Sequence, residues 1–311
     1  MTPKLLQRRR ERIDELADAG DAGVSLAKDA LRRMRANPVA ITGAIIVALF
    51  VVLAILAPFL APKDPRTQYA ELKNQLTPES IPGPMPGFLL GSDQYGYDLF
   101  SRLLVGAQQT LIVGVLATLI GVAVGCTLGG LAGAFGGWVD TALMRFTDIL
   151  LSFPSILLAI SVAALFAETN QWTVIIAVSM VAIPVFARLL RGAMLAQRHS
   201  DHVLAATALG VRRRTVVFRH ILPNALTPVI VQATLTLATS IIDAAALSFL
   251  GLGDPDPSRA EWGLMLAESQ QFIEVKPELA FLPAAAIIIV ALGFTLLGES
   301  LREALDPKKR R

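Results

Sequence analysis

The stretch that decides the fold is DHVLAATALGVRRRTVVFRHILPN, residues 201–224. It is a polar interval between long apolar segments. Ser200 or Asp201 can cap a helix there, because a short side-chain oxygen accepts hydrogen bonds from free backbone N–H groups. The alanine- and leucine-rich run at 203–209 favours a helix. Five arginines lie within or beside the stretch: Arg198, Arg212, Arg213, Arg214 and Arg219.

Gly210 is suited to the left-handed conformation that ends a helix. A second short helix is then predicted over residues 212–221, and Pro223 is expected to stop it. We call residues 201–224 the elbow. A helix, a glycine turn and a second short helix predict a compact surface that contacts another protein. The alternative is a basic loop whose arginines serve only membrane topology.

The composition predicts an all-α polytopic membrane protein rather than a soluble domain. Of the 311 residues, 54% are hydrophobic and 17% are charged, and the mean hydropathy is +0.57. The single cysteine, Cys126, lies in an apolar run, so no disulfide forms within the chain. We interpret it as a small packing residue.

Six stretches are apolar and long enough to cross a bilayer, which takes about 20 residues. Pro154 and Pro184 lie inside two of them and are expected to kink the helices. The second stretch exceeds one span, and we expect it to leave the membrane at its glycine-rich end. The six stretches are residues 37–62, 103–139, 149–167, 169–187, 221–253 and 279–298.

The other segments are polar. The N-terminal segment lacks the apolar core of a signal peptide close to its start, so we expect no cleavage. Within it, residues 26–34 favour an amphipathic helix that lies along the membrane. We expect a basic N-terminal segment at 1–36, outer loops at 63–102 and 254–278, a core of five spans within 103–300, and a tail at 301–311.

Glycines recur every fourth residue in the second stretch, a spacing that puts them on one helix face. Such a face allows a neighbouring helix to approach closely. The glycines are Gly121, Gly125, Gly129, Gly133 and Gly137.

The charge distribution predicts the orientation. Six spans put both termini on one side of the membrane. With that side in the cytoplasm, 22 of the 28 Lys and Arg are cytoplasmic and six lie outside. This split follows the positive-inside rule, and the reverse orientation violates it. The outer segments carry 12 Asp and Glu, an acidic surface that favours docking of a soluble protein.

The chain shows no signature of a nucleotide site or of catalysis. It has no GxxxxGK[ST] motif, so no loop of its own is predicted to cradle phosphates. Its three histidines all lie in or beside the elbow, close to arginines that disfavour a bound cation. We therefore predict a non-catalytic chain with no cofactor, no metal and no nucleic-acid partner.

Asp243 is the one ionisable residue deep within a predicted span. A charge at that depth is costly, so it is expected to face a partner, a cavity or an aqueous path. Two interpretations remain open: a residue of a transport pathway, or a structural hydrogen bond to a neighbouring helix. An ion-coupled secondary transporter that uses Asp243 is the alternative from another functional class.

Several motifs resemble those of the permeases of ABC importers. The spacing of Ala205, Ala206, Gly210 and Pro223 resembles the EAA loop of that family, with Leu204 at the usual glutamate and His220 at the usual isoleucine. Asp201 lies one turn before Leu204. Four further stretches resemble the dipeptide/oligopeptide branch: LGSDQYGYDLFSRLLVGAQQTL (90–111), AGAFGGWVDTALMRFTDILLSFPSILLAI (132–160), AALSFLGLG (245–253) and LREALDP (301–307).

The N-terminal stretches LRRMRANPVAITG (31–43) and LAPFLAPKDP (56–65) resemble the C-type permease subunit of this branch. Tyr97 stands where the GxDxxGRD signature usually has arginine. The resemblance implies a six-helix permease of a bacterial inner membrane, in a heterodimer with a second permease. It also implies two ATPase subunits that hold ATP and Mg, an extracytoplasmic solute-binding protein, and peptide or nickel substrates.

In the family, the EAA loop is a coupling helix that docks on the ATPase. The resemblance implies that role for the loop at 188–223, with membrane lipid around the spans. The residues expected to couple are Asp201, Leu204, Ala205, Ala206, Gly210, Arg213 and Pro223.

Overall fold

The computed structural model describes residues 26–77 and 79–305, and the described chain is helical with no β-strand. Expectations for residues 1–25 and 306–311 lie outside the described residues. The helices are α2 (Leu26–Ala36), α3 (Pro38–Leu60), α4 (Ala70–Lys73), α5 (Leu99–Phe135), α6 (Gly137–Leu151), α7 (Ser155–Ala163), α8 (Gln171–Gln197), α9 (Asp201–Ala208), α10 (Arg213–Thr215), η1 (Val216–Ile221), α11 (Leu222–Ala225), α12 (Thr227–Phe249), α13 (Trp262–Ser269), η2 (Gln270–Phe272) and α14 (Glu278–Leu305).

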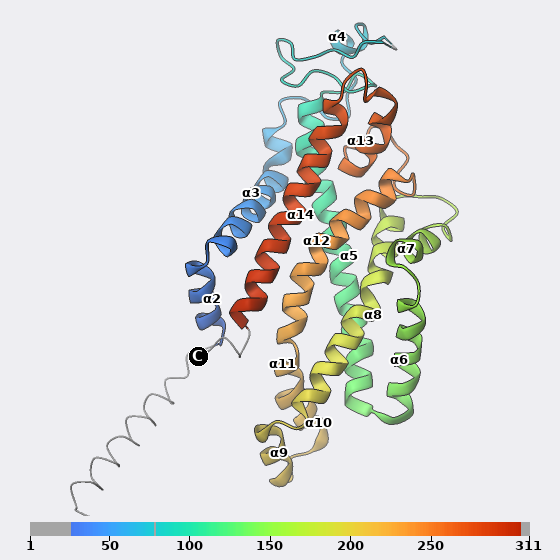
Figure 1. Cartoon of the computed structure of the whole chain (residues 1–311). Coiled ribbons are helices and arrows are strands. Elements are labelled where there is room, and N and C mark those ends of the chain that lie inside the picture. The colour runs from blue at the N-terminus through green and yellow to red at the C-terminus, as the bar shows by residue number, and fades with distance from the viewer. Residues whose placement is uncertain (1–25, 78, 306–311) are drawn as a thin grey trace, which may run out of the picture.

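Four long helices, α5, α8, α12 and α14, form the body of the molecule (Figure 1). Helix α3 packs on α14 and α5, and α6 packs on α8 and α5. We call the end that carries α9 and α10 the elbow end, and the end that carries α4 and α13 the loop end. Helix α2 lies towards the elbow end, beside the end of α14.

Within the described residues, five helices are long and apolar enough to cross a membrane: α3, α5, α8, α12 and α14. A sixth span exists only if α6 and α7 are counted together, because they meet at a bend of 94°. The stretch 149–167 is therefore divided between two helices, and the break beside Pro154 is sharper than the kink that we expected within one span. Pro154 lies at the break and precedes α7, in keeping with the restriction that proline puts on the preceding backbone. Pro184, by contrast, lies inside a continuous α8.

The boundaries of the other spans differ in detail from the expected ones. Helix α5 begins at Leu99, inside the expected outer loop, because Asp98 caps it by accepting a hydrogen bond from the Ser101 backbone N–H at 2.9 Å. Helix α14 continues to Leu305, into the expected tail. Helix α12 begins at Thr227 rather than at residue 221.

The glycine face of α5 packs directly on α8, as its spacing predicts. A Cβ built at Gly121 would lie 2.6 Å from the Cβ of Ala182, and one at Gly129 would lie 2.2 Å from the carbonyl oxygen of Ala187. A Cβ at Gly125 would lie 2.5 Å from the carbonyl oxygen of Ile183, and one at Gly133 would lie 2.9 Å from Met194 Sδ. Gly137 does not belong to this face. It has φ +58 and starts α6, where it completes the turn that Gly136 begins with φ +68.

Ion pairs also join α6 to α8. Arg191 makes a bidentate pair with Asp140, with nitrogen–oxygen distances of 2.9 and 2.7 Å, and Arg188 pairs with Asp148. Each pair joins one residue on α6 to one on α8. These contacts satisfy four charged side chains that would otherwise be costly near a membrane.

Candidate functional site

The first helix of the elbow, α9, ends as its sequence predicts. Gly210 has φ +77, and its N–H donates to the Thr207 carbonyl at 3.0 Å. The N–H of Val211 reaches back to the Ala206 carbonyl at 3.1 Å. Together these bonds make a Schellman motif, which satisfies carbonyls left free at a helix end. Ser200 holds the N-cap position, but its hydroxyl donates to the Gln197 carbonyl instead of capping α9.

The second half of the elbow stays helical through Pro223. A short α10 leads into η1, a π-helical turn, and then into α11. Pro223 lies in the first turn of α11, directly after the π-helical turn. The expectation that Pro223 stops the helix is therefore wrong. Turns of this π type are frequent at functional sites.

Helix α9 buries one face and exposes the other. Val203 and Ala206 are buried, and Val203 belongs to an apolar cluster with residues of η1 and α8. The exposed face carries Asp201, Leu204, Ala205 and Ala208, and we call these four residues the docking face, after the role that is proposed for them below. Ala206, expected to insert into a partner, instead contacts its own chain.

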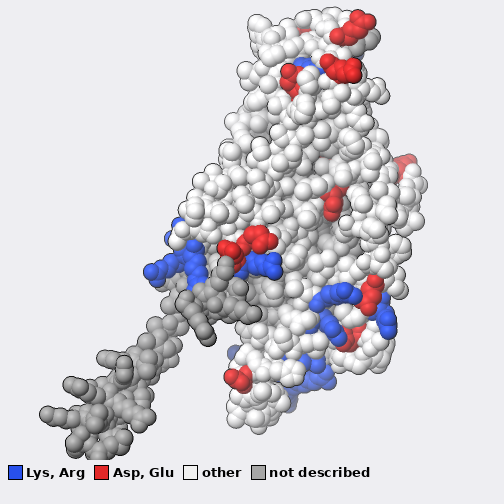
Figure 2. All heavy atoms as spheres, in the orientation of Figure 1, with Lys and Arg blue, Asp and Glu red and all other residues white. Residues whose placement is uncertain are grey.

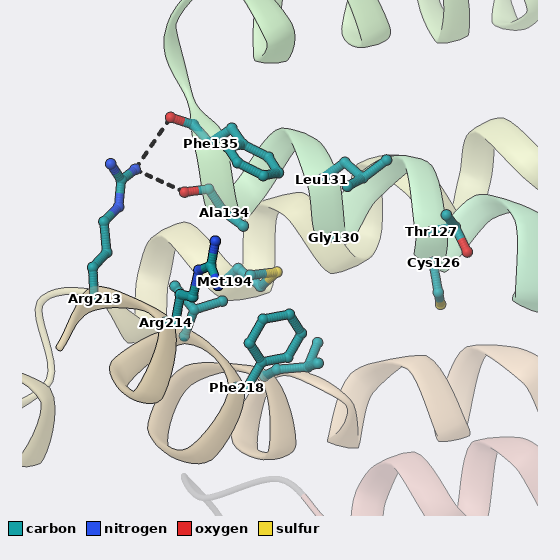
Figure 3. Close-up of a pocket in the computed structure, with 12 residues that line it drawn as sticks. Cys126, Thr127, Gly130, Leu131, Ala134, Phe135, Met194, Arg213, Arg214 and Phe218 are labelled. Carbon is teal, nitrogen blue, oxygen red and sulfur yellow. Dashed lines mark hydrogen bonds between the residues drawn. The ribbon is translucent and has the colours of Figure 1, made fainter.

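Two arginines bind the end of α5: Arg213 of the elbow, drawn in Figure 3, and Arg198 at the end of α8. Arg213 Nη2 donates to the carbonyl oxygens of Ala134 and Phe135 at 2.8 and 3.2 Å. Arg198 donates to the carbonyls of Gly133 and Ala134. The last carbonyls of a helix lack intrahelical partners and carry its partial negative charge, so two guanidinium groups stabilise this end. Sequence reasoning placed Arg213 on the coupling surface; the residue is exposed, and the structure adds these contacts to α5.

A groove of about 580 Å³ separates the end of α5 from η1 (Figure 3). Its lining is mostly apolar and includes Leu131, Met194 and Phe218, with Arg213 and Arg214 at one side. Cys126 lines the groove and is partly buried, so it is not a fully packed core residue.

Asp243 lies on α12, in the half of that helix further from the elbow. It is half-buried, and no described residue forms a hydrogen bond or an ion pair with it. The structural interpretation, a hydrogen bond to a neighbouring helix, therefore has no support within the described chain.

A buried ionic cluster occupies the loop end. Arg102, at the start of α5, is fully buried, and its Nε lies 3.2 Å from Asp93 Oδ2. Its Nη2 lies 3.9 Å from Glu268 Oε2 on α13. The ring of Tyr97 covers the guanidinium, with 4.6 Å from Cζ to the ring centroid. The tyrosine that departs from the family signature thus makes a cation–π contact with Arg102. Sequence reasoning missed this cluster and counted Arg102 only as an outer charge.

Burial raises the pKa of both carboxyl groups in this cluster. It raises the pKa of Glu268 to about 7, although Arg102 opposes the shift. Burial also raises the pKa of Asp93, against the attraction of Arg102 and hydrogen bonds from backbone N–H groups. Beside it, Lys276 Nζ donates to the carbonyls of Pro82, Leu90 and Ser92 at 2.6, 3.2 and 2.9 Å. The ammonium group therefore holds the outer loop against the chain that leads into α14.

Comparison with known proteins identifies the family. A family model described as "Binding-protein-dependent transport system inner membrane component" matches residues 121–311, more than half of the chain. The chain belongs to this family. A second family, the N-terminal TM domain of oligopeptide transport permease C, matches residues 25–78.

Similar permeases match almost the whole chain. It is 41% identical over 287 residues to the dipeptide transport system permease protein DppC of Alkalihalophilus pseudofirmus, covering 92% of this chain and 91% of that one. It is 44% identical over 279 residues to the glutathione transport system permease protein GsiD of Escherichia coli O6:K15:H31, covering 89% of each. Among solved structures, the inward-facing MetNI methionine ABC transporter is similar in fold, with a TM-score of 0.54, 19% identity and coverage of 66% of this chain and 96% of that one.

This chain is therefore an ABC-importer permease of the oligopeptide-type C branch, a multi-pass protein of the bacterial inner membrane. The family implies a partner permease and ATPase subunits, and its permeases are generally non-catalytic. Membership does not support the ion-coupled alternative. On the face shown in Figure 2, the long middle of the body is almost free of charge, and Lys and Arg gather towards the elbow end.

Proposed function

We propose that this chain is the C-type permease subunit of an ATP-driven, binding-protein-dependent importer of di- or oligopeptides. The docking face of α9 couples it to the ATPase subunits. The names of the similar permeases, which specify dipeptide and glutathione transport, favour a peptide substrate over nickel.

The observation that carries the proposal is how firmly the docking face is held. Behind it, Val203 packs in one apolar cluster with η1 and α8. Arg198 and Arg213 bind the carbonyl end of α5. The chain itself continues from the elbow into α12. A push on α9 therefore reaches α5, α8 and α12 together.

The orientation follows from the same charges. We place the elbow end and both termini in the cytoplasm, so that α6 and α7 together make a sixth, bent span. Most Lys and Arg then lie inside, as the positive-inside rule requires. The loop end, with its acidic surface, faces outward and receives the solute-binding protein.

The subunit supplies a path, and its partners supply energy. A second, related permease completes the path as a heterodimer, and two ATPase subunits bind ATP and Mg. The chain has no phosphate-binding loop in its sequence. The isolated chain is expected to show no ATP hydrolysis above a mock preparation.

Ala205→Trp tests the coupling surface. Ala205 is exposed on the docking face, so the indole adds bulk towards a partner without disturbing the inner face of α9. In the complex reconstituted in vesicles, we expect the variant to lose most of the ATP hydrolysis that the loaded binding protein stimulates, and most of the peptide uptake. Retention of the ATPase subunits is measured by affinity co-purification.

Ala205→Ser is the matched control, and it should couple like the wild type because it stays small. Ala206→Trp is expected to lower the stability of the permease itself, because Ala206 is buried within the elbow. Normal uptake and stimulated hydrolysis by Ala205→Trp would show that α9 is not the coupling element.

A further inference from the structure

A polar stripe runs along one face of α12, and the other polar residues of this helix, Thr227, Thr234, Ser240 and Ser248, lie off that face. Gln232, Thr236, Thr239 and Asp243 are spaced by four, three and four residues, so they lie on one face over three turns, about 16 Å. Gln232 Nε2 donates to Thr236 Oγ1 at 3.3 Å. Thr239 is exposed, Gln232 and Asp243 are half-buried, and Thr236 is buried.

The opposite face of α12 packs into the subunit. Ala238, Ile241 and Ala245 are buried in one core cluster with residues of α5 and α14. Ile241 lies against α5, because a Cβ built at Gly114 would approach its Cγ1 to 2.6 Å. Thr236 lies at the buried edge of the stripe, and the other three residues face away from this core cluster.

Lipid is a poor neighbour for such a face. Asp243 is six residues, about 9 Å, from the end of α12 at Phe249, so it lies well within the span. No described residue pairs with it. An unpaired carboxylate and three uncharged polar side chains in a membrane helix normally face water or a pathway.

We infer that this stripe lines the transport path and that Asp243 makes the path favour solutes that carry positive charge. An ammonium group that passes the stripe meets an unpaired carboxylate in a surrounding of low dielectric constant, where charge attraction is strong. Gln232 and the two threonines supply hydrogen bonds along the rest of the stripe. The inference rests on the proposed function, and it adds a charge preference that resides in the permease.

The test uses three peptides that differ in one side chain: Ala-Lys-Ala, Ala-Ala-Ala and Ala-Glu-Ala. Uptake of each is measured in vesicles that hold the complete complex, with wild-type chain, Asp243→Asn or Asp243→Glu. Dividing the rate of each variant by that of the wild type removes the selectivity of the binding protein. We expect Asp243→Asn to slow Ala-Lys-Ala about tenfold more than Ala-Glu-Ala, and Asp243→Glu to restore the wild-type order.

Assembly and ATP hydrolysis without substrate are measured in the same vesicles and should not change. An equal loss for all three peptides, or no loss, would overturn the inference, since a structural contact is indifferent to substrate charge. Failure of the wild-type complex to take up any of the peptides in the presence of ATP would instead overturn the proposed peptide importer, and the inference with it.

Discussion

Arg102 shows what a single residue does at the loop end. It is fully buried between two carboxylates, one on the outer loop and one on α13, and it belongs to α5 itself. A buried ion pair is a weak source of stability, because the charges lose their hydration. Its effect is instead specific: it fixes the loop and α13 to one point on α5.

Glu268→Gln should change how stability depends on pH. The pKa of Glu268 is about 7 in the folded chain, above its ordinary value of 4.5. The folded state thus binds this proton more tightly than the unfolded state does. The contribution of Glu268 to the free energy of unfolding is therefore complete below pH 4.5 and is lost as the pH rises through 7. It amounts to at most about 3 kcal/mol. We expect the wild-type melting temperature to fall between pH 5 and 8, and the variant to fall less.

The control is Glu274→Gln, which removes an exposed carboxylate from the segment between α13 and α14. Its melting temperature should depend on pH as that of the wild type does. The melting temperature of Glu268→Gln should still fall somewhat as the pH rises, because the pKa of the neighbouring Asp93 is also raised. Equal slopes for the wild type and Glu268→Gln would contradict the assignment.

At the scale of elements, the contact between α5 and α8 depends on absent side chains. Gly129→Ala places a methyl group 2.2 Å from a backbone oxygen of α8, so the helices must separate. Overpacking of this kind costs about 1–3 kcal/mol. Gly130→Ala, one residue further, meets nothing closer than 3.8 Å and should be neutral or slightly stabilising. Thermal unfolding of the purified permease in detergent measures both, and equal melting temperatures would refute the close contact.

Elements that depend on local chemistry could be predicted from the sequence. The run at 203–209 and Gly210 specify a helix and its end through propensity and a positive φ, and the structure has both. The side of α9 that is buried could not be predicted, because η1 covers it and η1 lies beyond the turn. Likewise, Pro154 predicts a break, but the 94° bend depends on how α6 and α7 pack on α8. Arg102 looked like any other outer arginine, since a count of charges carries no information about burial.

At the scale of the whole molecule, two introduced cysteines, one at each end, can report the orientation in the membrane. Thr207 is exposed on α9, and Glu71 is exposed on α4, at opposite ends of the molecule. In a Cys126→Ser background, a maleimide that does not cross membranes should label Glu71→Cys in intact spheroplasts and leave Thr207→Cys unlabelled. Inside-out vesicles should reverse the pattern. Labelling of Thr207→Cys from outside would show that the proposed topology is inverted.

Helix α5 acts as a rod with both ends fastened. Its 37 residues extend about 55 Å. At one end its carbonyls bind Arg198 and Arg213, and near the other its own Arg102 binds the outer loop. A tilt of about 5° about one end moves the other by roughly 5 Å over that length. A rotation of the elbow that tilted α5 by this amount would therefore displace the loop end, without any relay of side chains between the two ends.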